Sequence, residues 1–147
     1  MVALTGADDQ TFIDKAVFDK IRACLGRSHY ETGGILGMSN GMINAFEFDI
    51  YSGHELFEYY PTADFFESVI NGVWAGTNIS FCGFVHSHLH NNVISEQDAL
   101  YTRETLRANK QINTLIMGIY DLSAKKQPLR WYSVNLLTVK EINVLCA

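Results

Sequence analysis

Two histidines separated by one residue constrain this chain more than any other feature. His86 and His88 follow an apolar run over residues 79–85, which is typical of a strand that is covered on both faces. Successive side chains of a strand alternate between its two faces, so both imidazoles point to the same side and can bind one metal ion. Asp98 follows His88 by ten residues, past a short loop and in the first turn of a predicted helix. Two histidines and a carboxylate leave the fourth position of a tetrahedral zinc site open, which is typical of catalytic sites.

Length and composition predict one folded domain over residues 1–147. A chain of this size can bury a self-sufficient core. Hydrophobic residues make up 48% of the chain and charged residues 18%, a balance that argues against disorder.

Several classes of protein are disfavoured by charge and by segment length. The net charge is −5 and the basic residues are scattered, so we expect no nucleic-acid partner. Residues 1–10 lack the features of a signal peptide, and no run of eighteen apolar residues predicts a membrane span. We therefore expect a soluble, cytoplasmic protein. Cys24, Cys82 and Cys146 form no C-x-x-C pair, so we expect small buried thiols rather than disulfides or a thiolate zinc site.

Helical and strand patterns alternate along the chain. Asp14 can cap a helix that ends at Gly26, and Asn40-Gly41 predicts a hairpin between residues 32–38 and 42–50. Residues 51–60 have no clear period and are predicted to form a loop. Pro61 can occupy the first turn of the next helix. Strands are predicted over residues 79–85, 112–120 and 130–134, and a helix over residues 95–108. Residues 136–147 are ambiguous between strand and helix. The fold class is therefore α/β (α+β), with a mixed, curved β-sheet flanked by helices.

The metal motif resembles the signature of a known family. His86-Ser87-His88 with the downstream pair Ser95-x-x-Asp98 resembles the pattern of the JAMM (MPN-domain) metalloproteases, which adds an upstream glutamate in a segment like Glu-x-x-Gly-x-Leu-x-Gly. In that place this chain has Glu31-Thr32-Gly33-Gly34-Ile35-Leu36-Gly37. The resemblance covers nearly the whole chain in element order. It implies a cytidine-deaminase-like/MPN fold of the compact prokaryotic type.

The resemblance also implies a role for each of five residues. It assigns His86, His88 and Asp98 to Zn²⁺, Glu31 to the general base and Ser95 to stabilising the oxyanion. Zinc lowers the pKa of its bound water towards about 7, so a nearby carboxylate can take the proton and pass it to the leaving amine. Ser95 lies at a predicted helix N-terminus, where a hydroxyl donor and the helix dipole both favour negative charge.

The chain departs from the family pattern in the loop after the second histidine. Six residues rather than about seven separate His88 from Ser95, and Leu89 replaces a common proline. His90 would share a face with His86 and His88 if the strand continued. We leave His90 out of the ligand set because the family pattern needs only the first two histidines.

The resemblance implies a zinc metallopeptidase, of the isopeptidase or peptidase kind. It would cleave after the C-terminal glycine of a ubiquitin-like protein or its conjugate, in the manner of a deubiquitinase. The tail of such a substrate would bind extended, as an added strand beside the metal. Compact members of the family often act beside ubiquitin-activating or conjugating-like enzymes, including in antiviral defence, or process sulfur-carrier proteins.

There are three alternatives to a zinc metallopeptidase, one for the Ser95–Asp98 pattern and two for the whole chain. Ser95 to Asp98 also matches an ordinary capping box at a helix start. The whole chain can be a catalytically silent MPN scaffold, although it keeps the full residue set. A zinc deaminase is disfavoured because that chemistry uses His-x-Glu followed by Pro-Cys-x-x-Cys, and neither is present.

Overall fold

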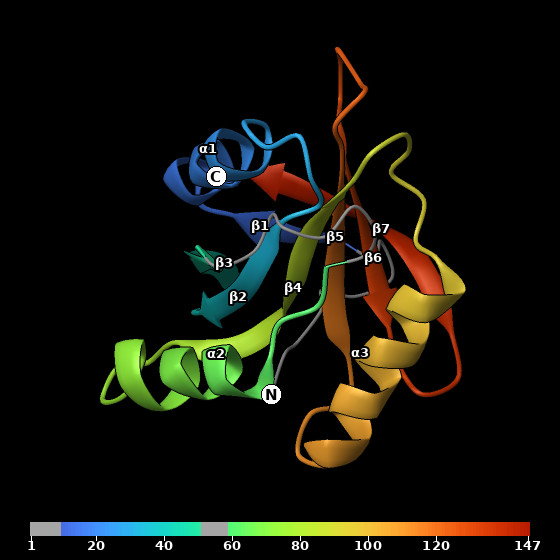
Figure 1. Ribbon diagram of the computed structural model, residues 1–147. Coiled ribbons are helices and arrows are strands. Elements are labelled where there is room, and N and C mark those ends of the chain that lie inside the picture. Colours follow the sequence, from blue (N-terminus) through green and yellow to red (C-terminus); the bar gives the residue numbers. More distant parts are fainter. Residues whose placement is uncertain (1–9, 51–58) are drawn as a thin grey trace.

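Seven strands close into one barrel in the computed structural model, which describes residues 10–50 and 59–147 (Figure 1). The strands are β1 (Gln10–Ile13), β2 (Gly33–Ser39), β3 (Met42–Phe48), β4 (Ser80–His88), β5 (Leu115–Asp121), β6 (Leu129–Val134) and β7 (Val139–Cys146). The helices are α1 (Lys15–Leu25), α2 (Ala63–Ser68) with its π-helical continuation η1 (Val69–Val73), and α3 (Glu96–Ala108). The strand order around the barrel is β1-β3-β2-β4-β5-β6-β7.

The sheet is mixed, as the hairpins predicted, but it is closed rather than open. Strands β2, β3, β4, β5, β6 and β7 form antiparallel pairs with neighbours, and β4 and β5 pair in parallel. Closure depends on the four residues of β1, which pair in parallel with β3 on one side and with β7 on the other. Phe12 lies opposite both Met42 and Leu145. The ambiguous tail over residues 136–147 is thus the strand that completes the barrel.

The Asn40-Gly41 hairpin forms as predicted. Asn40 has a φ of 53° and Gly41 a φ of 76°. Positive φ at both central residues belongs to the type I′ turn, whose twist matches that of the flanking strands. Ser39 and Met42 pair directly across the turn, and this sets the register of β2 against β3.

The helix ends follow their capping residues. The carboxylate of Asp14 accepts a hydrogen bond of 2.8 Å from the amide of Ala16, which confirms it as the cap of α1. The prediction that Pro61 lies in the first turn of the second helix is wrong. Thr62 is the cap there, because its hydroxyl oxygen accepts from the amide of Phe65, and α2 begins one residue later.

Two hydrophobic clusters lie on opposite faces of the barrel wall. One is covered by α1 and the other by α2, η1 and α3, consistent with the placement of these helices in Figure 1. Adjacent residues of one strand go to different clusters, since side chains alternate. Trp131 packs in the cluster beneath α1, whereas its neighbour Tyr132 packs in the other.

The remaining expectations are met in part. Within the two described ranges, no helix is both long and apolar enough to cross a membrane. All three cysteines are free, but only Cys82 is buried, while Cys146 is exposed. The predicted loop over residues 51–60 falls largely on residues 51–58, which lie outside the described residues.

Close strand packing at Gly83 yields a test of the fold. A Cβ atom at this position would lie 1.9 Å from the carbonyl oxygen of Ile116 in β5, and a backbone oxygen within a ladder cannot move aside cheaply. We expect Gly83→Ala to lower the free energy of unfolding by about 3 kcal/mol. Gly72→Ala is the matched control: a Cβ there meets no atom within 4 Å, and because Gly72 lies in η1 the change should leave this free energy unchanged or raise it by up to about 1 kcal/mol. Equal urea midpoints for the two variants would contradict this packing.

Candidate metal centre

Strand β4 carries both histidines of the motif to one face. The strand runs through His88, and it is hydrogen-bonded between β2 and β5. The rings of His86 and His88 lie edge to face with centroids 4.8 Å apart, and both are buried. The strand ends there, so His90 does not continue the row and is exposed.

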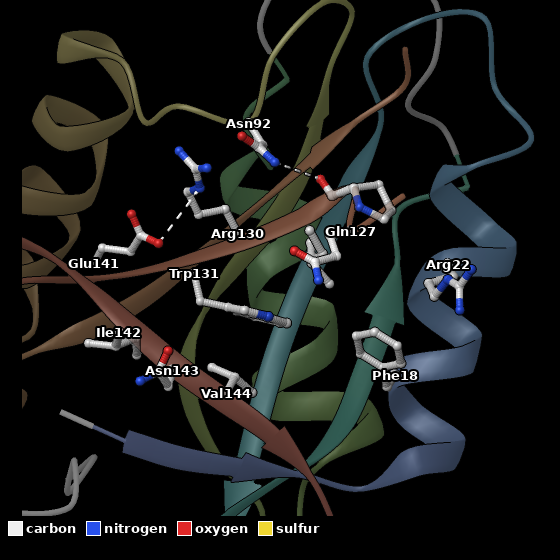
Figure 2. A pocket seen from close by; sticks show the side chains of 12 residues that line it. Phe18, Arg22, Asn92, Gln127, Arg130, Trp131, Glu141, Ile142, Asn143 and Val144 are labelled. Atoms are coloured by element: carbon white, nitrogen blue, oxygen red, sulfur yellow. Dashed lines mark hydrogen bonds and ion pairs between the residues drawn. The ribbon is translucent and has the colours of Figure 1, made fainter. Parts of the chain in front are cut away.

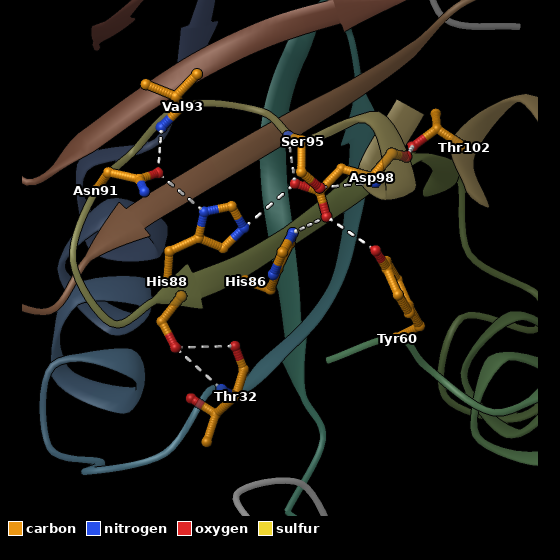
Figure 3. Close-up of polar contacts among 10 residues, drawn as sticks. Thr32, Tyr60, His86, His88, Asn91, Val93, Ser95, Asp98 and Thr102 are labelled. Carbon is orange, nitrogen blue, oxygen red and sulfur yellow. Dashed lines mark hydrogen bonds and ion pairs between the residues drawn. The ribbon is translucent and has the colours of Figure 1, made fainter. Parts of the chain in front are cut away.

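Asp98 reaches this pair from the first turn of α3. Its Oδ1 lies 3.0 Å from Nε2 of His86, and its Oδ2 lies 3.2 Å from Nε2 of His88. Figure 3 shows the three side chains pointing toward one another. One ligand atom from each residue lies within 4.8 Å of the others, and Asp98 has an exposed fraction of 0%. The structure therefore brings together the three residues that the sequence predicted as metal ligands.

The distances within this group fit a shared ion. Both Nε2 atoms are buried, and neither is assigned a hydrogen-bond partner in the described part of the chain, although each lies close to an oxygen of Asp98. Two ligand atoms about 2.0 to 2.1 Å from a tetrahedral zinc ion lie about 3.3 Å apart. The distances from the Asp98 oxygens to His86 and His88 are close to this value. A buried His86, His88 and Asp98 group thus fits a metal ion.

A neighbouring asparagine sets the tautomer of His88. Nδ1 of His88 lies 3.3 Å from Oδ1 of Asn91. The amide of Val93 donates to the same Oδ1 at 3.0 Å, which identifies that atom as the oxygen. When the ring is neutral, Nδ1 is therefore the protonated nitrogen, and Nε2 carries the lone pair that can bind a metal ion.

The charges of the group are shifted in opposite directions. Burial raises the pKa of Asp98, but the imidazoles of His86 and His88 and the amide of Ser95 lower it by more, so the net pKa lies well below its ordinary range. Burial lowers the pKa of His88, but Asp98 and Asn91 raise it by more, so the net pKa lies above its ordinary value. Asp98 is thus ionised and ready to bind a cation.

Ser95 and Asp98 also form the capping box that the sequence allowed. The hydroxyl oxygen of Ser95 accepts from the amide of Asp98 at 3.0 Å, and Oδ2 of Asp98 accepts from the amide of Ser95 at 2.9 Å. Capping and convergence on the histidines are therefore compatible. Ser95 is half-buried beside the triad, and its hydroxyl proton is not used by the cap.

Glu31 lies next to the triad. Gly33 pairs with His86, and the amide of Ser87 donates to the carbonyl of Thr32, so one further step of the antiparallel ladder places Glu31 opposite His88. Paired residues of antiparallel strands share a face, which directs Glu31 toward the same side as the imidazoles. Its exposed fraction is 7%, and its buried Oε1 has no hydrogen-bond partner in the described residues. Burial raises the pKa of Glu31, although His88 and His86 oppose the shift.

Ser87 fastens the segment that carries Glu31. Its side chain accepts a hydrogen bond of 3.0 Å from the amide of Thr32, and its own amide donates to the carbonyl of Thr32 at 2.8 Å. Both residues are buried. The residue between the two histidines therefore has a structural role, and it links the predicted base to the predicted ligands.

The loop between His88 and Ser95 is anchored at Asn92. The side-chain amide of Asn92 donates to the carbonyl of Pro128 at 3.2 Å, and its own carbonyl accepts from the hydroxyl of Tyr132 at 2.9 Å. Asn92 also lines a hollow of about 500 Å³ bounded by α1, β6 and β7, whose lining side chains are drawn in Figure 2. With these anchors, a spacer of six residues is long enough to bring Asp98 to the histidines.

One residue of the site was missed by the sequence analysis. The hydroxyl of Tyr60 donates to Oδ1 of Asp98 at 3.2 Å (Figure 3). Tyr60 stands 38 residues before Asp98, in a stretch without any clear period. No spacing rule or motif pointed to it, because the contact depends on how the segment before α2 packs against α3.

Comparisons with known proteins support the fold. No protein-family model and no curated protein sequence matches the chain. The solution structure of protein DSY2949 from Desulfitobacterium hafniense is similar with a TM-score of 0.67 and 14% identity, over 93% of this chain and 92% of that one. The crystal structure of AF2198, a JAB1/MPN domain protein from Archaeoglobus fulgidus, is similar with a TM-score of 0.52 and 15% identity, over 95% and 99%. The fold of this chain is therefore similar to that of a JAB1/MPN domain.

The geometry of the triad predicts stoichiometric binding of a divalent metal ion. We expect His86→Ala to weaken Zn²⁺ binding by more than about 100-fold. Loss of a residue that only orients a ligand can cost roughly 100-fold, and this variant removes a ligand itself. His90→Ala is the matched control, since His90 is exposed and outside the group, and it should bind Zn²⁺ like the wild type. Isothermal titration of the metal-free proteins measures both affinities. Equal affinities for the two variants would remove His86 from the site.

The opposite pKa shifts predict how the stability of the metal-free protein depends on pH. The raised pKa of His88 adds stability that is complete below its ordinary value of 6.5 and is lost as the pH rises through the folded-state pKa. The lowered pKa of Asp98 adds stability that is present above its ordinary value of 3.8 and is lost at lower pH.

The wild type should therefore have a higher free energy of unfolding than Asp98→Asn. The difference should be largest between pH 3.8 and pH 6.5, the two ordinary pKa values, and smaller at higher pH. Urea denaturation in a chelator, from about pH 5 to about pH 9, measures this difference. A difference that stays constant over that range would contradict the coupling of Asp98 to His88.

Proposed function

We propose that this protein is a zinc-dependent isopeptidase or peptidase that cleaves after the C-terminal glycine of a ubiquitin-like protein or its conjugate. The observation that carries the proposal is the convergence of His86, His88 and Asp98 on one buried point, with Glu31 directed to the same side. The fold likeness to a JAB1/MPN domain supports it. The residue pattern shared with the JAMM metalloproteases supports it as well.

The donor set favours zinc among the common divalent ions. Imidazole nitrogens suit zinc, whereas magnesium and calcium prefer sites made of oxygen ligands. His86 and His88 supply two nitrogens, and Asp98 supplies one carboxylate oxygen. Three protein ligands leave one position for water or substrate.

The side chains around this position divide the chemistry of hydrolysis among them. A bound zinc ion would act as a Lewis acid and lower the pKa of a coordinated water towards about 7. Glu31 would accept a proton from the attacking water and deliver it to the leaving amine, a task that suits a buried carboxylate without a protein partner on Oε1. Ser95 would donate its hydroxyl proton to the oxyanion, aided by the positive end of α3.

The proposed substrate is recognised by its shape more than by its charge. A Gly-Gly tail is narrow and extended, so its main chain can pair with a strand edge while glycine fits between close walls. Ubiquitin-activating or conjugating-like enzymes would make the conjugates that this hydrolase removes, and antiviral defence is one setting proposed for such a set. We propose a cytoplasmic location because these enzymes work on intracellular conjugates.

Replacing the proposed base tests the function directly. Glu31→Gln keeps the shape of the side chain but removes its basicity, so we expect cleavage to fall by about 10²- to 10⁴-fold. Zn²⁺ affinity should stay within a few-fold of the wild type. Glu67→Gln is the control, because Glu67 is exposed on α2. Cleavage of ubiquitin-like fusions that end in Gly-Gly is measured for each protein, with and without a chelator.

Each outcome of this experiment decides between two functions. Cleavage by wild type and Glu67→Gln but not by Glu31→Gln supports the hydrolase. Equal cleavage by all three proteins would remove Glu31 from its proposed role. A wild-type protein that binds no zinc and cleaves no fusion would instead be a scaffold, the alternative that its fold also allows.

A further inference from the structure

The carboxylate of Asp98 is held by a hydrogen bond on each oxygen. The amide of Ser95 donates to Oδ2 at 2.9 Å, and the hydroxyl of Tyr60 donates to Oδ1 at 3.2 Å. Oδ1 is also the atom that lies 3.0 Å from Nε2 of His86. With both oxygens bound, rotation of the carboxylate about its Cβ–Cγ bond is restricted. The two bonds differ in origin, since one comes from the helix cap and the other from a distant segment.

The ring of Tyr60 is itself fixed from several sides. It stacks on Tyr101 of α3 with centroids 4.6 Å apart and an angle of 22° between the planes (Figure 3 shows Tyr60 directed at Asp98). The hydroxyl of Tyr101 donates to the carbonyl of Pro61 at 3.0 Å. The buried Tyr59 donates to Oδ2 of Asp49 at 2.8 Å. The residues on both sides of Tyr60 are therefore tied down, and its hydroxyl is held where it meets Asp98.

We propose that Tyr60 is a positioning residue of the metal centre, which acts through Asp98. The proposal rests on metal binding by His86, His88 and Asp98, as in the proposed function. Ligating carboxylates are commonly oriented by hydrogen bonds from residues behind them, and loss of such a partner costs about 10- to 100-fold in metal affinity. Without the Tyr60 hydroxyl, Oδ1 loses the partner that fixes its position beside His86. A single long hydrogen bond of this kind places the expected loss near the lower end, at about 10-fold.

The test compares the hydroxyls of two tyrosines. Tyr60→Phe keeps the stacked ring and removes the hydroxyl that donates to Asp98. Tyr120→Phe is the matched control, because Tyr120 packs against the cluster beneath α1 and its hydroxyl lies beside Gly26, outside the metal group. Zn²⁺ dissociation constants are measured by competition with a chromogenic chelator. The visible spectrum of the Co²⁺-loaded protein reports the ligand geometry, and the melting temperature of the metal-free protein reports the fold.

We expect Tyr60→Phe to bind Zn²⁺ about 10-fold more weakly than the wild type and to change the Co²⁺ spectrum. Tyr120→Phe should do neither, and both metal-free variants should melt close to the wild type. If Tyr60→Phe binds within twofold of the wild type, or if Tyr120→Phe loses as much affinity, the role of Tyr60 is overturned while the hydrolase proposal stands. If the wild type itself binds no metal, both proposals fail.

Discussion

A carboxylate with no exposed surface is the constraint on which this site depends. Removing an ionised carboxylate from water costs several kcal/mol, and Asp98 recovers that cost from groups on several elements. The histidines of β4 lie at 3.0 and 3.2 Å, the amide of Ser95 caps one oxygen, and Tyr60 donates to the other. No one element supplies enough of these partners. The charge of Asp98 is therefore tolerated only when β4, α3 and the segment before α2 have assembled.

Strand β4 arranges the rest of the site through the alternation of its side chains. His86 and His88 lie on one face, while Ser87 between them hydrogen-bonds Thr32 and so fastens the segment beside β2. The same ladder brings Glu31 level with His88. A one-residue slip of β4 against β2 would exchange the two faces and separate the proposed base from the proposed ligands. The close packing of β2 on β4 at Gly33 opposes such a slip, because a Cβ atom there would lie 2.5 Å from the carbonyl oxygen of Val85.

The parts that the sequence predicted are those governed by local rules. A period of two residues places His86 and His88 on one face of any strand, and a Ser-x-x-Asp pattern favours the start of a helix. The type I′ hairpin at Asn40-Gly41 needs nothing beyond its own two residues. Barrel closure and the contact of Tyr60 with Asp98 depend instead on pairing between remote segments. No pattern in the four residues of β1 predicts that this strand pairs with both β3 and β7. Likewise, Tyr60 lies in a stretch without a clear period, and nothing there predicts its contact with Asp98.

The capping box and the metal group share Asp98, so the start of α3 and the position of a metal ligand depend on the same side chain. Oδ2 of Asp98 accepts from the amide of Ser95 and still faces His88, since a carboxylate oxygen has two lone pairs. The cap orients Asp98 before any ion is present, so less conformational entropy remains to be lost on binding. A substitution at Ser95 would therefore weaken the start of α3 and disturb the site together. The hydroxyl of Tyr60 lies outside the cap, so its loss separates the orientation of the carboxylate from the stability of the helix.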